Sequence, residues 1–247
     1  MNKHGLARSI PEPVMREVRQ RCGFGCVICG RAIVQYDHFA PERVDAQEHR
    51  ADGITLLCGY CHDKKTRGII GVEEIKRFDS DPVCKRNGFT HDFLFASREG
   101  IHFQIGSATF RRHAVIAYEN ELLVGFAPPE TDNGPLRLFA RMEDDEGGHL
   151  IEIVDNIWFA GTHHFDVETV GKALVIRRRL GDITLKMLLN PGGEIVLDHL
   201  KMGYRGFRVT VENSRFNIRL PNGGRLVLSC QNIHSTLRLS SNGGAAV

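Results

Sequence analysis

The chain has 247 residues, of which 42% are hydrophobic and 25% are charged. This is the composition of an ordinary globular protein, long enough for one large domain or two small ones. No apolar run approaches the roughly eighteen residues that a membrane-spanning helix needs. The opening "MNKHGLARSIPEP" also lacks the apolar stretch of a secretory signal. We therefore expect a cytoplasmic protein with no membrane partner.

The formal net charge of +2 divides unevenly along the chain. Residues 1–90 carry 15 Lys and Arg against 12 Asp and Glu, whereas residues 91–247 carry 17 against 18. This mild asymmetry favours a nucleic-acid partner for the first part of the chain.

The first 90 residues contain helix signals and one short strand. "SIPEPVMREVRQRCG" predicts a helix that Ser9 caps, with Pro11 in the first turn and Gly23 at the end. "AIVQY" predicts a strand over residues 32–36, followed by a polar loop over residues 39–52. "CGYCHDKKT" opens a second helix, and "GVEEIKRF" forms a third that "DSDP" stops.

Beyond residue 90 the pattern changes to short apolar runs separated by Gly, Asn, Asp and Pro. Such runs include "ELLVGF", "ALVIRRR", "GFRVTV" and "RLVLS". Their spacing is typical of an all-β sandwich or barrel. "ITLKMLLNPGGEIVLD" and "FNIRLPNGGRLVLS" each predict a hairpin with a Gly-Gly turn. We expect the all-β domain to span residues 91–240, followed by a disordered tail over residues 241–247.

The cysteines are concentrated near the N-terminus. Cys26 and Cys29 form one Cys-x-x-Cys pair, and Cys58 and Cys61 form another. Zinc takes four tetrahedral ligands, and two such pairs supply four thiolates, so we predict a structural zinc site. The remaining cysteines, Cys22, Cys84 and Cys230, are expected to be packing residues.

A zinc site alone leaves three residues unexplained. Asp37 and His38 stand at the end of the predicted strand, inside the span between the cysteine pairs, and His62 begins the helix after the second pair. A carboxylate and an imidazole suit a divalent metal that also binds phosphate. A second imidazole beside them can deprotonate water. Together these are the groups needed for one-metal phosphodiester hydrolysis.

The motifs "RCGFGCVICG", "YDH", "ITLLCGYCH" and "KKT" resemble those of an HNH endonuclease, the zinc-bearing ββα-metal finger of bacterial and phage nucleases. The resemblance covers residues 9–70, about a quarter of the chain. It implies an α+β protein whose first 90 residues form the HNH domain, with the larger all-β domain following.

The resemblance also implies a role for each matching residue. His38 would be the general base, Asp37 and His62 would hold Mg²⁺ or another divalent metal, and the four cysteines would bind zinc. Lys64, Lys65 and Arg67 stand where they could contact the phosphates of double-stranded DNA, although a solvated helix face explains each of them equally well.

One position departs from the family pattern. Gly53 stands five residues before Cys58, where the family has an Asn that holds the loop bearing the base. We expect Asp52 or His49 to take over that role, and His49 to be a candidate for the catalytic site.

Three functions remain open. The first is a DNA endonuclease, serving restriction or phage defence. The second is a non-catalytic zinc-finger protein that binds nucleic acid through a degenerate site. In the third, the β domain is the main functional part, acting as a specificity, sensor or oligomerisation module that controls the nuclease.

Overall fold

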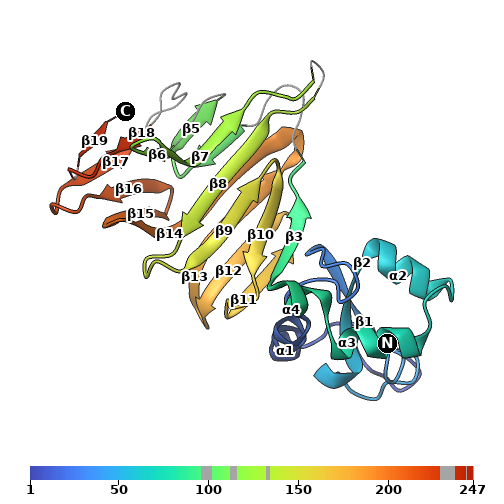
Figure 1. Cartoon of the computed structure of the whole chain (residues 1–247). Helices are drawn as coiled ribbons and strands as arrows, with labels where there is room; N and C mark the ends of the chain where they lie inside the picture. The colour runs from blue at the N-terminus through green and yellow to red at the C-terminus, as the bar shows by residue number, and fades with distance from the viewer. Residues whose placement is uncertain (96–101, 112–115, 132–133, 229–236, 243, 247) are drawn as a thin grey trace. The chain divides into compact units, whose positions relative to one another are not determined.

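The computed structural model describes residues 1–95, 102–111, 116–131, 134–228, 237–242 and 244–246. The chain forms two compact units (Figure 1). Unit 1 comprises Met1–Asp92 and Gly161–Thr169, and unit 2 comprises Phe93–Ala160 and Val170–Val247. The segment Gly161–Thr169, which the sequence analysis assigns to the β domain, belongs to unit 1.

Strands make up 46% of the described residues and helices 18%, so the described part of the protein is predominantly β. Within the described residues the α-helices all lie in unit 1. Its elements are α1 (Glu12–Cys22), β1 (Val34–His38), a 3₁₀ turn η1 (Ala51–Gly53), β2 (Ile54–Cys58), α2 (Gly59–Thr66), α3 (Val72–Ser80) and α4 (Val83–Asn87). None of the helices in the described parts of the chain is long and apolar enough to cross a membrane.

The helices of unit 1 follow the local sequence closely. α1 ends at Gly23, whose φ of 75° is the left-handed conformation that glycine adopts most readily. Its start differs from the prediction, because Pro11 is the N-cap and no side chain caps the helix. Ser9 is therefore not a cap. α2 and α3 occupy the predicted segments, whereas the short helix α4 was not predicted.

The first strand begins two residues later than predicted. β1 pairs with β2 in an antiparallel two-stranded sheet, with Asp37 opposite Thr55 and His38 opposite Ile54. Asp37 and His38 are thus the last two residues of the strand itself, and both are buried. The position within the sheet fixes their backbone more firmly than a loop would.

Hydrogen bonds bind the returning segment Gly161–Thr169 into unit 1, and three of them are made to backbone carbonyls. The backbone N–H of Thr162 donates to the carbonyl of Gly88, at 2.9 Å. The side-chain amide of Gln20, in α1, donates to the carbonyl of Phe165, at 2.7 Å. The Thr169 hydroxyl donates to the carbonyl of Ala32, also at 2.9 Å. Unit 1 is therefore built from two stretches of chain that lie far apart in the sequence.

Unit 2 consists of two sheets. The first sheet contains the strands β19-β18-β6-β7-β8-β9-β10 in that spatial order. The second sheet contains β12-β13-β14-β15-β16-β17, in the order of the sequence. In the second sheet β4 also pairs in parallel with β14, and β5 pairs with β4. The chain passes between the units three times, in β3 (Phe89–Phe93), at the end of β10 and in β11 (Asp166–Val170). The bounds of the first sheet are β6 (Ile116–Tyr118), β7 (Glu121–Ala127), β8 (Arg137–Glu143), β9 (His149–Val154), β10 (Ile157–Gly161), β18 (Leu237–Leu239) and β19 (Ala245–Ala246). Those of the second are β4 (His102–Ile105), β5 (Ala108–Arg111), β12 (Ala173–Arg179), β13 (Asp182–Asn190), β14 (Glu194–Tyr204), β15 (Phe207–Glu212), β16 (Arg215–Arg219) and β17 (Arg225–Leu228).

The two sheets of unit 2 pack through their apolar faces. Phe103 of β4 meets Phe126 of β7 edge to face, with ring centroids 6.1 Å apart. Tyr118 of β6 lies between Tyr204 and Phe207 of the other sheet, at 5.5 and 6.2 Å. Such edge-to-face contacts are the favoured geometry of aromatic rings. The predicted all-β part is thus confirmed as two packed sheets.

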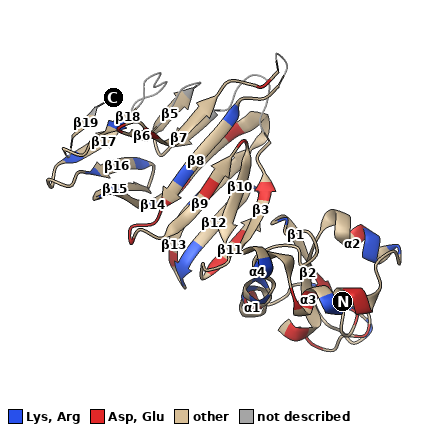
Figure 2. Ribbon diagram, in the orientation of Figure 1, with Lys and Arg blue, Asp and Glu red and all other residues tan. Residues whose placement is uncertain are grey.

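Both predicted hairpins occur in the second sheet. β13 pairs with β14 through the turn that begins at Pro191, and β16 pairs with β17 through the turn of "PNGG". Figure 2 shows acidic and basic residues interspersed over strands β8 to β13.

The tail differs from the prediction of disorder. Ala245 and Ala246 form β19, which pairs with β18 and satisfies backbone groups that a free tail would leave to water. Cys230 lies outside the described residues.

Candidate metal centre and active site

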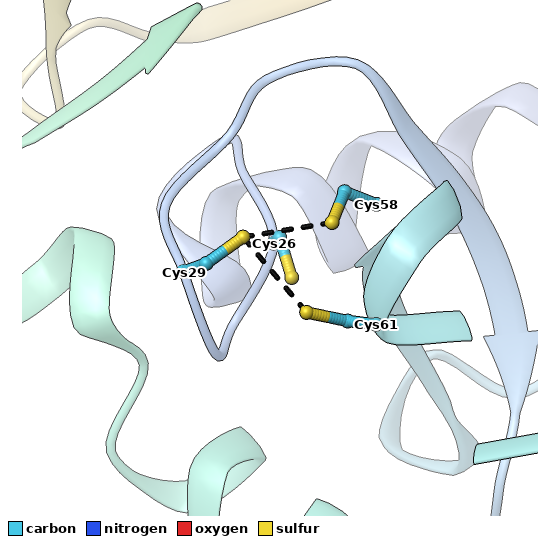
Figure 3. Close-up of side chains that lie close together, drawn as sticks. All are labelled: Cys26, Cys29, Cys58 and Cys61. Atoms are coloured by element: carbon cyan, nitrogen blue, oxygen red, sulfur yellow. Dashed lines mark hydrogen bonds between the residues drawn. The ribbon is translucent and has the colours of Figure 1, made fainter. Parts of the chain in front are cut away.

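The four cysteines of the two pairs converge in unit 1 (Figure 3). Cys26 and Cys29 lie in the turn after α1, Cys58 ends β2 and Cys61 lies in the first turn of α2. The turn is closed by a hydrogen bond from the Gly30 N–H to the Cys26 carbonyl, at 2.8 Å. All four sulfur atoms lie within 4.8 Å of one another.

This arrangement fits a tetrahedral zinc ion. Four sulfurs bonded at about 2.3 Å in a tetrahedron lie about 3.8 Å apart. In the structure the sulfur of Cys29 lies 3.5 Å from the sulfur of Cys58 and 3.9 Å from the sulfur of Cys61. The predicted cysteine cluster is confirmed as a group that could hold a metal such as zinc.

The cluster also stabilises a thiolate, the form in which cysteine binds metals. The hydrogen bond from Cys29 and the backbone N–H groups around the turn lower the pKa of Cys26 to about 5. The same contact raises the pKa of Cys29, because one proton is shared between the two sulfurs. Burial raises the pKa of Cys61 to about 12.

Cys22 and Cys84 stand apart from this group. Both are fully buried, and burial raises the pKa of their thiols to about 11 and about 12 respectively. Cys22 packs in the apolar core of unit 1 with Val18 and Leu56. The prediction that these two cysteines are packing residues is confirmed.

Asp37 is the centre of a second polar group. One of its carboxylate oxygens, Oδ1, lies 3.4 Å from Nε2 of His62, and the other, Oδ2, lies 2.7 Å from Nζ of Lys65. Lys65 also donates to the backbone carbonyl of His38, at 3.2 Å. The strand-end carboxylate and the helical imidazole are therefore brought together, as the sequence analysis expects of the metal-binding pair.

The geometry of that pair suits a shared cation. Donor atoms bonded to one ion at about 2.1 Å in neighbouring positions lie about 3 Å apart. The 3.4 Å between Asp37 Oδ1 and His62 Nε2 is close to that separation. Lys65 supplies a competing positive charge at the other oxygen.

His38 contacts a different partner. Its Nε2 lies 3.1 Å from Nδ1 of His49, and Nε2 of His49 lies 3.1 Å from the carbonyl oxygen of Ala7. A carbonyl can only accept a hydrogen bond, so Nε2 of His49 carries a hydrogen and Nδ1 of neutral His49 accepts from His38. This leaves Nδ1 of His38 with its lone pair free.

The surroundings of His38 favour its neutral form over the charged one. Burial lowers its pKa below the ordinary value, and the positive charge that His49 would carry lowers it further. The ring also borders a pocket of about 260 Å³ that Ala40, Pro41, Asp45, Ala46, Gln47, Glu48, Arg50 and Gly53 complete.

Gly53 holds the loop after β1 through its backbone. The N–H groups of Phe39 and Ala40 point at its carbonyl oxygen, at 3.0 and 3.4 Å. A side chain has no room there, because a Cβ on Gly53 would lie 2.4 Å from the carbonyl oxygen of Ala40. The close backbone approach explains why glycine stands at this position.

The two residues expected to compensate for Gly53 behave differently from each other. Asp52 is exposed and forms a two-pronged ion pair with Arg50, so it does not hold the loop. The expectation for Asp52 is thus wrong, since a local arginine takes its carboxylate. His49 instead contacts His38 directly.

The three basic residues of α2 and its end each have an intramolecular partner. The ammonium of Lys64 lies over the ring of Tyr60, 4.4 Å from its centroid, and Arg67 pairs with Asp63 at 2.9 Å. Lys65 binds Asp37. Arg67 is exposed and Lys64 is half-buried, whereas the Lys65 side chain is 12% exposed. Lys65 is therefore a residue of the Asp37 group rather than a free surface cation.

One further cluster in unit 1 was not predicted from the sequence. Arg19 of α1 is 4% exposed and binds Asp166 at 2.7 Å, Glu12 at 2.8 Å and Glu168 at 3.2 Å. These carboxylates lie close enough together to suggest a metal site, but the Arg19 guanidinium already occupies their centre. Burial alone would lower the pKa of Arg19, but its hydrogen bonds to Asp166 and Glu12 keep that pKa above the ordinary value. No local signal marks this cluster, because Arg19 and Asp166 are 147 residues apart.

No protein-family model, no curated protein and no solved structure matches this chain.

Proposed function

We propose that unit 1 is a metal-dependent endonuclease of the HNH type that hydrolyses phosphodiester bonds in DNA. The observation that carries the proposal is the pairing of Asp37 with His62 beside the four-cysteine cluster, with the neutral His38 next in the strand. The order β1, β2 and α2 around that cluster supports the ββα-metal interpretation.

In this proposal each residue has a defined task. His38 accepts the proton of the attacking water at Nδ1, the nitrogen that its contact with His49 leaves free. His49 is a positioning residue that fixes the orientation and tautomer of His38. The backbone carbonyl of Gly53 holds the loop that follows His38.

Asp37 and His62 would hold the divalent ion. Such an ion, when bound, polarises the scissile phosphate and stabilises the leaving oxygen. Lys65 keeps the Asp37 carboxylate oriented and neutralised until a cation takes its place. Lys64 and Arg67 would exchange their surface partners for phosphates of the DNA backbone.

Cleavage of supercoiled plasmid with Mg²⁺, Mn²⁺ or Ni²⁺ tests the proposal. We expect His38→Ala to lower the cleavage rate by about 10²–10⁴-fold, because a positioned general base contributes that much. His4→Ala is the matched control, since His4 is an exposed histidine of the same unit. Equal cleavage by the wild type and His38→Ala would remove His38 from the mechanism.

The ion pair of Lys65 with Asp37 favours a second candidate function. If the ammonium of Lys65 stays on the Asp37 carboxylate, it takes the place of the catalytic divalent cation. Unit 1 would then be a zinc finger that binds nucleic acid without cutting it. Plasmid binding with no cleavage in any of the three metals, by the wild type and by Lys65→Gln alike, would establish this alternative. Cleavage by the wild type would refute it.

A further inference from the structure

Three arginines form a straight row across the second sheet of unit 2. Arg208 of β15 is directly opposite Arg219 of β16, and Arg219 is directly opposite Arg225 of β17. Residues that are directly opposite in an antiparallel sheet project from the same face. All three side chains are exposed, and Figure 2 shows basic segments on β16 and beside β17. We call these three residues the arginine row.

Among the residues that the structure describes, the arginine row has no acidic counterpart. Within the described residues, no ion pair involves Arg208, Arg219 or Arg225. Other arginines of unit 2 are paired: Arg178 binds Asp145, Glu146 and Asp182. Like charges directly opposite one another destabilise a sheet, so the row lowers the stability of the fold unless something binds it.

Protection of the sheet edge does not explain the row. β17 is the last strand of its sheet, and a charge on an edge strand discourages pairing with other chains. Arg225 could serve that purpose. Arg208, however, lies two strands further in, on β15, where a charge does not protect the edge.

The row borders a polar groove of about 460 Å³ whose other lining residues are Thr210, Asn217 and Gly223. The hydroxyl of Thr210 and the amide of Asn217 add hydrogen-bond donors. The lining contains neither a carboxylate nor an aromatic ring. Such a surface suits an anion and offers no ring on which a base could stack.

We propose that this groove binds the phosphate backbone of a nucleic-acid strand. Arginine presents a planar fork of donors that matches phosphate oxygens. Neighbouring strands are about 4.8 Å apart, so the row extends over about 10 Å, which exceeds what one phosphate group can occupy. A polymer of phosphates therefore fits it better than a mononucleotide. The inference rests on unit 2 alone and does not require unit 1 to be a nuclease.

The test measures the affinity of the full-length protein for a short fluorescein-labelled single-stranded oligonucleotide by fluorescence anisotropy. EDTA is included so that no cleavage occurs. The triple variant Arg208→Gln, Arg219→Gln, Arg225→Gln is compared with a control triple that removes the same charge elsewhere on unit 2, Arg141→Gln, Arg179→Gln, Arg238→Gln. The control arginines are also exposed.

We expect the row variant to bind about tenfold more weakly or worse, and the control to bind within about twofold of the wild type. Each phosphate contact to a single strand contributes about 0.7 to the slope of log affinity against log salt concentration. Loss of three contacts should therefore make that slope shallower by about 2. Because the substitutions relieve repulsion, thermal unfolding should show no loss of stability. The single variant Arg219→Gln, which removes the middle charge, should show a smaller change in the same direction.

Three results would overturn the proposal. The first is equal affinity and salt slope for the wild type and the row variant. The second is an equal loss in the row and control variants, which would mean that general charge and not this groove attracts the strand. The third is complete competition by inorganic pyrophosphate or thymidine monophosphate at concentrations that do not affect the row variant, which would assign the groove to a small phosphorylated molecule.

Discussion

Unit 1 and unit 2 are stabilised by different chemistry. The largest fully buried aromatic side chains, Trp158, Phe103, Phe110, Phe207 and Phe216, all lie in unit 2. The apolar core of unit 1 consists mainly of aliphatic side chains, with Phe39 as its buried aromatic residue, and includes Cys26, Cys58 and Cys61. A small unit with a small core usually needs a metal or another cross-link in addition to apolar burial.

The arginines of the two units also differ, in their burial and in their charged partners. In unit 1, Arg19 is buried and surrounded by carboxylates, which makes it a part of the fold. In unit 2, the arginine row is exposed, and each of its arginines lies directly opposite another arginine on the neighbouring strand. Burial with partners indicates a structural charge, whereas exposure without partners indicates a charge available to a ligand.

The largest change in stability is expected when one cysteine of the cluster is removed. Cys58→Ser should abolish zinc binding and unfold unit 1, because structural zinc contributes about 10–16 kcal/mol in small zinc domains. Unit 2 should keep its strand signal in circular dichroism. Zinc content and thermal unfolding measure the two effects.

Cys84→Ala is the control for that experiment. It removes a buried thiol of the same unit that lies outside the cluster, so zinc content should stay at the wild-type level and stability should fall by about 1–3 kcal/mol. Retention of zinc and of unit 1 structure by Cys58→Ser would show that the cluster does not hold the fold.

The next largest effect is expected from Asp166→Ala. It leaves Arg19 buried without its closest partner, and breaking a buried ion pair costs about 3–5 kcal/mol. Asp198→Ala removes an exposed ion pair with Lys186 in unit 2 and should cost less than about 1 kcal/mol. Urea unfolding measures both. Equal costs for the two variants would mean that the Arg19 cluster is no more structural than a surface pair.

Smaller changes in stability are expected from two glycine substitutions in unit 1. Gly53→Ala places a methyl group 2.4 Å from the Ala40 carbonyl, so the backbone must move and we expect a loss of about 1–3 kcal/mol. Gly59→Ala adds the same methyl group where nothing lies within 4 Å, at the start of α2. That variant should be more stable by about 0.5–1 kcal/mol. Thermal unfolding of both variants decides whether the close approach at Gly53 matters.

Local sequence signals were sufficient for much of unit 1. The cysteine spacing predicted the cluster, Gly23 predicted the end of α1, and "GVEEIKRF" predicted α3, because each depends on residues near one another in the chain. The pairing of Asp37 with His62 results from the way the cluster ties β2 and α2 to the turn that precedes β1.

The remaining features depend on contacts that local patterns do not encode. The register of β1 depends on its pairing with β2, which moves the strand two residues along the sequence and buries Asp37 and His38. The partner of Lys65 depends on the same register. Asp166 pairs with Arg19 across 147 residues of sequence, and no local pattern indicates that the Gly53 carbonyl accepts hydrogen bonds from Phe39 and Ala40.

The discontinuity of unit 1 has a consequence for the order of events on the ribosome. Its last segment, Gly161–Thr169, is synthesised only after Phe93–Ala160 of unit 2. At 5–20 residues per second, these roughly seventy residues take about 4–14 s to translate. During that interval the nascent chain contains every cysteine of the cluster and every residue of the proposed active site, while Arg19 has yet to meet Asp166. Completion of unit 1 is thereby delayed until most of the chain has been made.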